Sequence, residues 1–271
     1  MNRGLITKIA YEVWPPTLIF ILAMFALELL LANVLASFSQ NLMDQVMQVP
    51  FVQNLIKGLL GTDMPVSFDP RSFSAFAWVH PAVLTLLWAQ TITFCTRTPA
   101  AEIDRGTIDF LLGLPVSRFR LFCAETLVWL TCAAAMIGMG LFGFWIGNFT
   151  IPVDSRADFS RIVVIALNCL CLYLSVGSLA FLASALSERR GKAIAAVVAI
   201  VLASFLLNFL TQFSDTAAKL GFLSLMHYHR PLQVLHQSGW PAADMIVLLT
   251  IAAGFWLAAA IVFTRRDIRT T

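Results

Sequence analysis

The chain has 271 residues, of which 59% are hydrophobic and only 12% are charged, and its formal net charge is +3. A soluble domain carries about 25% charged residues, so the composition excludes an ordinary soluble domain. Apolar runs of about 20 residues indicate a polytopic all-α membrane protein. Because these runs are continuous, they favour helices over a β-barrel, whose strands alternate apolar and polar residues.

Residues 2–14 form a short amphipathic stretch. Its apolar residues recur at helical spacing, opposite polar residues that include Lys8 and Glu12. This pattern is typical of a helix that lies flat on a membrane surface. Pro15 and Pro16 follow and predict a break before the first span. A frayed tail is the alternative for this stretch.

Six apolar segments are long enough to cross a bilayer, for which a helix needs about 20 residues. The second contains His80 and Pro81, which a span tolerates where neighbouring helices satisfy the freed carbonyl. A cleaved signal peptide ending at Ala36 is the alternative for the first, but its apolar core of about 20 residues exceeds the roughly 7 to 15 typical of such peptides. The six segments are Thr17–Phe38, Ala75–Cys95, Phe122–Ile146, Ile162–Leu186, Ala193–Phe213 and Ala242–Thr264.

Positive charges are distributed unequally between the two sides of these spans. Six lysine and arginine residues lie in the first, third and fifth loops, and twelve lie at the two termini and in the other two loops. Lysine and arginine are enriched in the cytoplasmic loops of membrane proteins. We therefore expect both termini in the cytoplasm and a single six-span domain over residues 1–271.

Two outer segments have helical patterns of their own. The first loop, residues 39–74, has an apolar stripe after Pro50, which predicts an interfacial helix that packs on the bundle or contacts substrate. The segment 214–241 is apolar but interrupted by glycine and proline. It predicts two short helices, Thr216–Met226 and Pro231–Gln237, that dip toward the membrane without crossing it.

The same outer segment carries His227, His229 and His236. Three imidazoles can bind copper or zinc, but polar residues at a membrane interface are the more frequent case, and we expect no metal site. The five cysteines lie in or at the ends of apolar segments without a CxxC pair, which predicts small buried residues rather than metal ligands.

Four polar residues inside the predicted spans are candidates for the translocation path or for helix packing. A carboxylate at mid-bilayer costs roughly 2.5–3.5 kcal/mol, so Glu28 must face the bundle, a partner subunit or water. The amides usually bond between helices. The GxxxG pair Gly143 and Gly147 predicts close helix packing in the third span. The four candidates are Glu28, Gln90, Asn208 and Gln212.

A short charged segment, residues 98–120, separates the second and third spans. Its first half alternates charged and apolar side chains, as in an amphipathic helix that places its apolar side in a partner's groove. A solvated loop is the alternative. The candidate docking residues are Glu102, Asp104, Arg105, Gly106, Thr107, Asp109, Leu111 and Leu112.

Three motifs in this order resemble the permease subunits of type-2 ATP-binding-cassette exporters. Residues 102–107 (EIDRGT), followed by 111–112 (LL) and 114–118 (LPVSR), are similar to the first cytoplasmic loop of those permeases. Residues 228–235 (YHRPLQVL) resemble their outer re-entrant region, and residues 263–268 (FTRRDI) resemble their C-terminal ending. The resemblance covers the whole chain, including the number of spans.

The resemblance implies a permease of the bacterial inner membrane that pairs with a second permease subunit and exports its substrate. We expect the second subunit to be identical, and a different permease chain is the alternative. Two cytoplasmic ATPase subunits would dock on a coupling helix at 102–112, and residues 2–14 would be the elbow helix. In that family the second and fifth spans usually line the path. The chain has no GxxxxGK[ST] phosphate loop, so ATP and magnesium are expected on the partner and no cofactor on this chain. We expect no nucleic-acid partner.

Two other functions remain open at this point. A secondary transporter coupled to protons or sodium could use Glu28, but such folds usually contain internal repeats, and none is evident. A membrane-embedded enzyme would need a catalytic motif, and the sequence has neither an HExxH pair nor a serine nucleophile motif. An exporter subunit without catalytic residues is therefore the first hypothesis.

Overall fold

All regular elements that the structure describes are helical, and six of them are long and apolar enough to cross a membrane. The computed structural model describes residues 3–37, 72–108, 113, 116–153, 156–236 and 239–266. The predicted all-α architecture with six spans is therefore confirmed. The six candidate spans are Arg3–Val34, Ser74–Cys95, Arg118–Asn148, Phe159–Leu186, Arg190–Leu210 and Ala242–Arg265.

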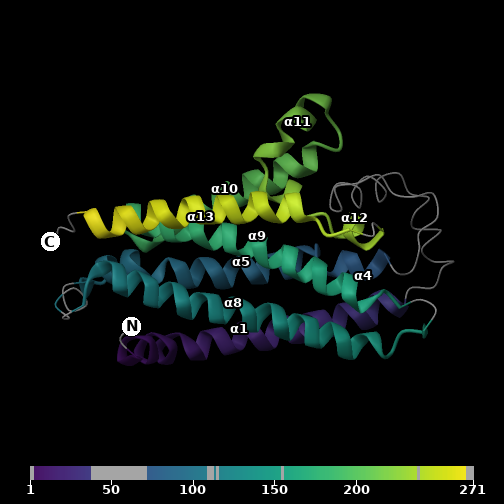
Figure 1. Ribbon diagram of the computed structural model, residues 1–271, viewed down its shortest axis with the longest axis horizontal. Coiled ribbons are helices and arrows are strands. Elements are labelled where there is room, and N and C mark those ends of the chain that lie inside the picture. Colours follow the sequence, from purple (N-terminus) through teal and green to yellow (C-terminus); the bar gives the residue numbers. More distant parts are fainter. Residues whose placement is uncertain are drawn as a thin grey trace.

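The long helices form a bundle in which both termini lie at one end, here called the terminal end (Figure 1). Helix α1 (Arg3–Ser37) packs along α8 (Arg118–Asn148), and α9 (Phe159–Leu186) packs along α13 (Ala242–Arg265). Helix α5 (Pro81–Cys95) contacts α9, α1 and α8. Helix α10 (Arg190–Leu210) packs mainly on α9.

Helix α1 is longer than the sequence predicts. It runs without interruption from Arg3 to Ser37 and contains both prolines, so the predicted break at Pro15 and Pro16 is wrong. A proline leaves the carbonyl four residues earlier without its N–H partner. Here these are the carbonyls of Tyr11 and Glu12, two exposed residues at which water can replace the lost bonds. The predicted elbow is thus the first part of α1, and its position on a membrane stays a prediction.

The second span is divided where His80 and Pro81 interrupt its apolar sequence. Helix α4 (Ser72–Ala77) ends before His80, and α5 begins at Pro81. The His80 imidazole accepts a hydrogen bond of 3.3 Å from the backbone N–H of Ala82 and so caps α5. Proline is well tolerated at a first helical position because its missing N–H would have no partner there.

Glycines allow α1 and α8 to approach closely. A Cβ atom on Gly143 would lie 2.4 Å from the carbonyl oxygen of Phe25, and one on Gly147 would lie 2.5 Å from the Cβ of Ala32. Neither distance is compatible with a side chain at these positions. The predicted role of the Gly143–Gly147 pair in close helix packing is confirmed, and the partner is α1 of the same chain.

The outer segment contains short helices, as predicted, but in more pieces. The structure has α11 (Asp215–Leu220), the 3-10 turns η3 (Gly221–Leu223) and η4 (Leu225–Tyr228), and α12 (Pro231–His236). Helix α11 projects away from the bundle, whereas α12 lies near α4 (Figure 1). Whether this segment dips toward the membrane stays a prediction.

Three predictions lie outside the described residues. The first is the interfacial helix after Pro50. The second is the docking role of Asp109, Leu111 and Leu112, and the third is the final part of the 263–268 motif.

Replacing Gly143 by alanine tests the contact between α1 and α8. The new methyl group would overlap the Phe25 carbonyl, so we expect a loss of roughly 1–3 kcal/mol of stability, which is typical of overpacking. The matched control is Gly138→Ala in the same helix, where a Cβ meets nothing within 4 Å. Thermal unfolding in detergent measures both variants, and equal melting temperatures would contradict the proposed close approach.

Candidate functional site

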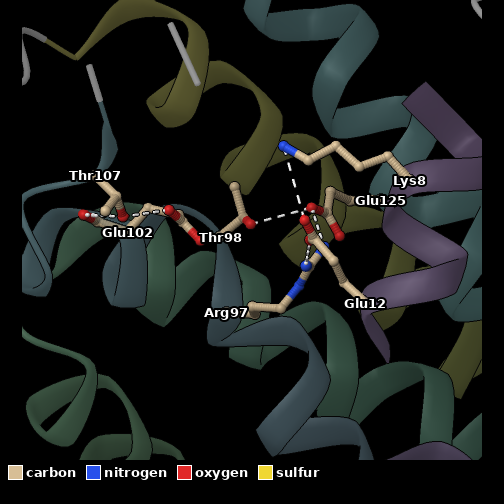
Figure 2. A network of polar contacts seen from close by, with 7 residues as sticks. All are labelled: Lys8, Glu12, Arg97, Thr98, Glu102, Thr107 and Glu125. Atoms are coloured by element: carbon tan, nitrogen blue, oxygen red, sulfur yellow. Dashed lines mark hydrogen bonds and ion pairs between the residues drawn. The ribbon is translucent and has the colours of Figure 1, made fainter. Parts of the chain in front are cut away.

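Arg97 joins three segments of the chain at the terminal end. Its Nη1 lies 2.5 Å from Oε2 of Glu12 on α1, and its Nη2 lies 2.6 Å from Oε1 of Glu125 on α8. Lys8 adds a second cation, 3.7 Å from the Glu12 carboxylate. Figure 2 shows the Arg97 side chain reaching toward the carboxylates of Glu12 and Glu125. The end of the second span is therefore tied to the first and third spans by charge.

The chain reaches this position through a turn that directly follows α5. Thr96 ends the helix, and its hydroxyl donates a 2.7 Å bond to the Ile92 carbonyl. The turn η1 (Arg97–Ala101) then runs through Thr98, whose backbone is extended and whose hydroxyl donates to Glu125 at 3.1 Å. The Ala100 N–H donates to Ser184 Oγ on α9 at 3.1 Å. The turn is thus fastened to both α8 and α9.

Burial makes the contact between Arg97 and Glu125 different from an ordinary surface pair. Glu125 is 4% exposed, and its charge is expensive unless a counter-charge lies beside it. Burial by itself lowers the pKa of Arg97, but the carboxylates of Glu125 and Glu12 outweigh it and raise that pKa above its ordinary value. Arg97 is therefore a permanent cation at this position.

The predicted docking helix is shorter than expected. Helix α6 covers only Glu102–Asp104, and the chain turns at Gly106, whose φ of +69° is a conformation that favours glycine. The Thr107 hydroxyl reaches back to Glu102 Oε2 at 2.5 Å. The prediction of one continuous helix over 102–112 is therefore wrong. Asp104 and Arg105 are exposed on this turn.

A cavity of about 390 Å³ lies beneath the turn. One helical face of α1, which includes Val13 and Phe20, forms one wall, and one face of α5, which includes Gln90 and Phe94, forms another. The turn and the start of α10 complete it. The lining residues are Glu12, Val13, Pro16, Thr17, Phe20, Gln90, Thr93, Phe94, Arg97, Glu102, Arg105 and Arg190.

The four candidate path residues do not come together. Gln90 lines the cavity at the terminal end, and its Oε1 accepts a hydrogen bond from the Tyr173 hydroxyl. Asn208 and Gln212 line a different hollow of about 200 Å³ beside the outer segment. Glu28 is fully buried in α1, and neither of its oxygens has a hydrogen-bond partner among the described residues. Their roles stay predictions.

The histidines of the outer segment have different surroundings. His229 is buried, with Nδ1 2.6 Å from Asn168 Oδ1 and Nε2 3.3 Å from the Trp78 carbonyl. His227 instead contacts the Arg230 guanidinium at 3.2 Å. The part of the chain that the structure describes contains no group of three histidine, cysteine, aspartate or glutamate residues that could hold a metal ion.

Sequence reasoning singled out the turn but missed the residues that hold it. Glu125 stands inside an apolar segment just as Glu28 does, and the same argument about buried carboxylates could have identified it. Arg97 and Arg190 flank spans where positive charge is usual, so their type gave no signal. The pairing of Arg97 with Glu12, 85 residues away, depends on the fold.

Comparison with known families places the chain among membrane transport proteins. A family model described as the C-terminal domain of the multidrug efflux system permease Rv1217c matches residues 15–264. The match includes Arg97, Glu125 and most of the cavity and begins just after Glu12. No curated protein matches the chain.

Replacing Arg97 by glutamine leaves Glu125 buried without its counter-charge. Removing one partner of a buried pair costs about 3–5 kcal/mol, so we expect a large fall in melting temperature. Glu12→Gln is the matched control, because its side chain is 44% exposed and such pairs contribute about 0–1 kcal/mol. The double variant Arg97→Gln with Glu125→Gln should recover part of the loss. Similar melting temperatures for the two single variants would refute this account.

His229 predicts a loss of stability in mild acid. Burial lowers its pKa from 6.5 to about 4, so between these values the unfolded chain binds a proton that the folded chain does not. The contribution of His229 to the free energy of unfolding is therefore fully present above pH 6.5 and is lost as the pH drops toward 4. At pH 5 the loss is about 2 kcal/mol. Melting temperatures at pH 7.5 and 5 measure this term. His229→Gln should reduce the difference between the melting temperatures at the two pH values. An unchanged difference in this variant would contradict the role of His229.

Proposed function

Because the chain belongs to the family of the Rv1217c multidrug efflux permease C-terminal domain, we propose that it is the membrane subunit of a type-2 ATP-binding-cassette exporter. The family indicates a transport subunit rather than an enzyme, and the six apolar helices make it a multi-pass membrane protein. The proposal adds that ATP is hydrolysed by separate cytoplasmic subunits, that a second permease subunit is identical to this one, and that the complex lies in a bacterial inner membrane.

The observation that carries the proposal is the charged turn at the terminal end, which comprises η1, α6 and the bend at Gly106. Asp104 and Arg105 are exposed on it, as a contact surface for a soluble protein requires. Its root is fastened through Arg97 to α1 and α8. A force applied to this turn would reach three spans directly.

The mechanism follows from these attachments. An ATPase that binds the turn would displace it when nucleotide binding closes the ATPase pair. Glu125 and Glu12 would transmit the displacement to α8 and α1, and the continuous chain would transmit it to α5. The cavity lined by Gln90 would change shape at the same time, since Glu102 and Arg105 of the turn belong to its walls.

One observation favours a second candidate, an ion-coupled transporter. Glu28 is a fully buried carboxylate without a hydrogen-bond partner among the described residues, and such groups inside spans often mark ion pathways. This candidate predicts transport that stops when an ionophore collapses the proton or sodium gradient. The exporter proposal predicts transport that stops when the ATPase loses its phosphate-binding lysine.

Charge reversal at Asp104 tests the docking site. Asp104→Lys should reduce co-purification of the ATPase by about tenfold or more, because like charges at an interface cost several kcal/mol. The variant should insert and melt normally, since Asp104 is exposed. Asp215→Lys is the matched control: this carboxylate is also exposed, and it stands at the start of α11 in the outer segment rather than on the turn.

Two results would overturn the proposal. One is undiminished ATPase binding by both Asp104→Lys and Arg105→Glu. The other is full transport by cells whose ATPase lacks its phosphate-binding lysine, together with loss of transport on addition of the ionophore.

A further inference from the structure

The cavity at the terminal end is lined by charged, polar and apolar side chains. Arg105 and Glu102 of the turn and Arg190 of α10 contribute charged groups to this lining. Val13, Phe20 and Phe94 contribute large apolar side chains, next to the buried polar residues Thr17 and Gln90. Its volume of about 390 Å³ lies within the range of roughly 300–1,000 Å³ usual for small-molecule sites.

The cations of the cavity differ in how far they are neutralised. Arg97 is shared between Glu12 and Glu125. By contrast, the ion pairs of the described residues include none formed by Arg105 or Arg190. Glu102 is the remaining acid of the lining, and Thr107 donates a hydrogen bond to it. The two guanidinium groups of Arg105 and Arg190 therefore outnumber the single carboxylate of Glu102 in this part of the lining.

Neutral oxygens hold Arg190 in place. Its Nη2 donates a 3.0 Å bond to the Thr93 carbonyl, and its Nε lies 3.5 Å from Thr96 Oγ1. These bonds orient the guanidinium beside α5 without compensating its charge. The cavity thus offers oriented donors and excess positive charge to a ligand.

We propose that this cavity binds an amphiphile with an anionic head group, a carboxylate or a phosphate, and an apolar tail. The guanidinium groups of Arg105 and Arg190 would bind the head group, since their planar donors match both anions. The tail would lie against Phe20 and Phe94. The inference deepens the proposed export function and rests on it, because it makes the cavity the place where substrate is collected.

This geometry also connects substrate binding with the turn. Arg105 belongs both to the exposed surface proposed for ATPase docking and to the cavity lining. A displacement of the turn would withdraw Arg105 from the head group while Arg190, on α10, stays behind. Binding of the ATPase to the turn would then lower the affinity of the cavity for the anionic head group.

Three dansyl-labelled probes with alkyl chains of equal length and different head groups test which head group the cavity binds. One carries a carboxylate, one a methylamide and one a trimethylammonium group, and fluorescence titration of the purified full chain gives each affinity. We expect the carboxylate to bind at least tenfold more tightly than the other two. Each substitution Arg105→Gln and Arg190→Gln should weaken its binding by about tenfold, the usual effect of losing a charge-assisted hydrogen bond.

The matched control is Arg189→Gln. Arg189 precedes Arg190 in the chain, is exposed, and does not line the cavity, so its removal should leave the affinity unchanged. Nanodiscs identify the source of the anion. If phosphatidylglycerol competes with the carboxylate probe and phosphatidylcholine does not, the ligand is a lipid head group. If neither competes, the ligand is a free amphiphile.

The proposal fails if the three probes bind within twofold of one another, or if Arg189→Gln weakens binding as much as Arg190→Gln. These measurements use neither ATPase nor nucleotide. Absence of head-group selectivity therefore refutes the cavity proposal alone, whereas transport without an ATPase refutes the proposed function and leaves the measured selectivity in place.

Discussion

A buried carboxylate near the end of a membrane span needs a counter-charge, and the terminal end of this bundle is organised around how Glu125 obtains one. Arg97, the residue that follows Thr96 at the end of α5, supplies this counter-charge. The position of the turn is therefore determined by α8. Such a pair adds little net stability compared with apolar packing, but a misplaced turn would leave both charges uncompensated. The contact acts mainly by fixing geometry.

The polar groups inside the bundle divide the helices into a firmly connected set and a loosely connected one. Tyr173 on α9 donates to Gln90 on α5, and Trp129 on α8 donates to Thr91 on α5 at 2.9 Å. These bonds join the second, third and fourth spans deep in the core. Helix α10 has a short buried face, and large apolar residues such as Leu202 and Leu206 remain exposed on it. Helix α10 is thus the peripheral member.

The sequence was sufficient for the features that depend on composition or on local chemistry. Six apolar runs predicted the six spans, and the spacing of Gly143 and Gly147 predicted a close helix contact. Local rules misled at Pro15 and Pro16, where exposure of the preceding turn lets the helix continue. They also misled at Gly106, because an amphipathic pattern does not reveal a positive φ. The contacts that build the cavity join residues far apart in the chain, and no periodicity encodes them.

The relative strength of these attachments indicates which wall of the cavity moves. Separating the turn from α8 would break the buried pair of Arg97 and Glu125, at about 3–5 kcal/mol. Separating α10 from α5 at the cavity would break the bond from Arg190 to the Thr93 carbonyl, worth roughly 1.5–3 kcal/mol, and the longer contact of 3.5 Å between Arg190 and Thr96 Oγ1. The turn should therefore move together with α8 as one body, and the cavity should open on the side of α10. A ligand anion that replaces the Thr93 carbonyl as the partner of Arg190 would lower the cost of that opening further.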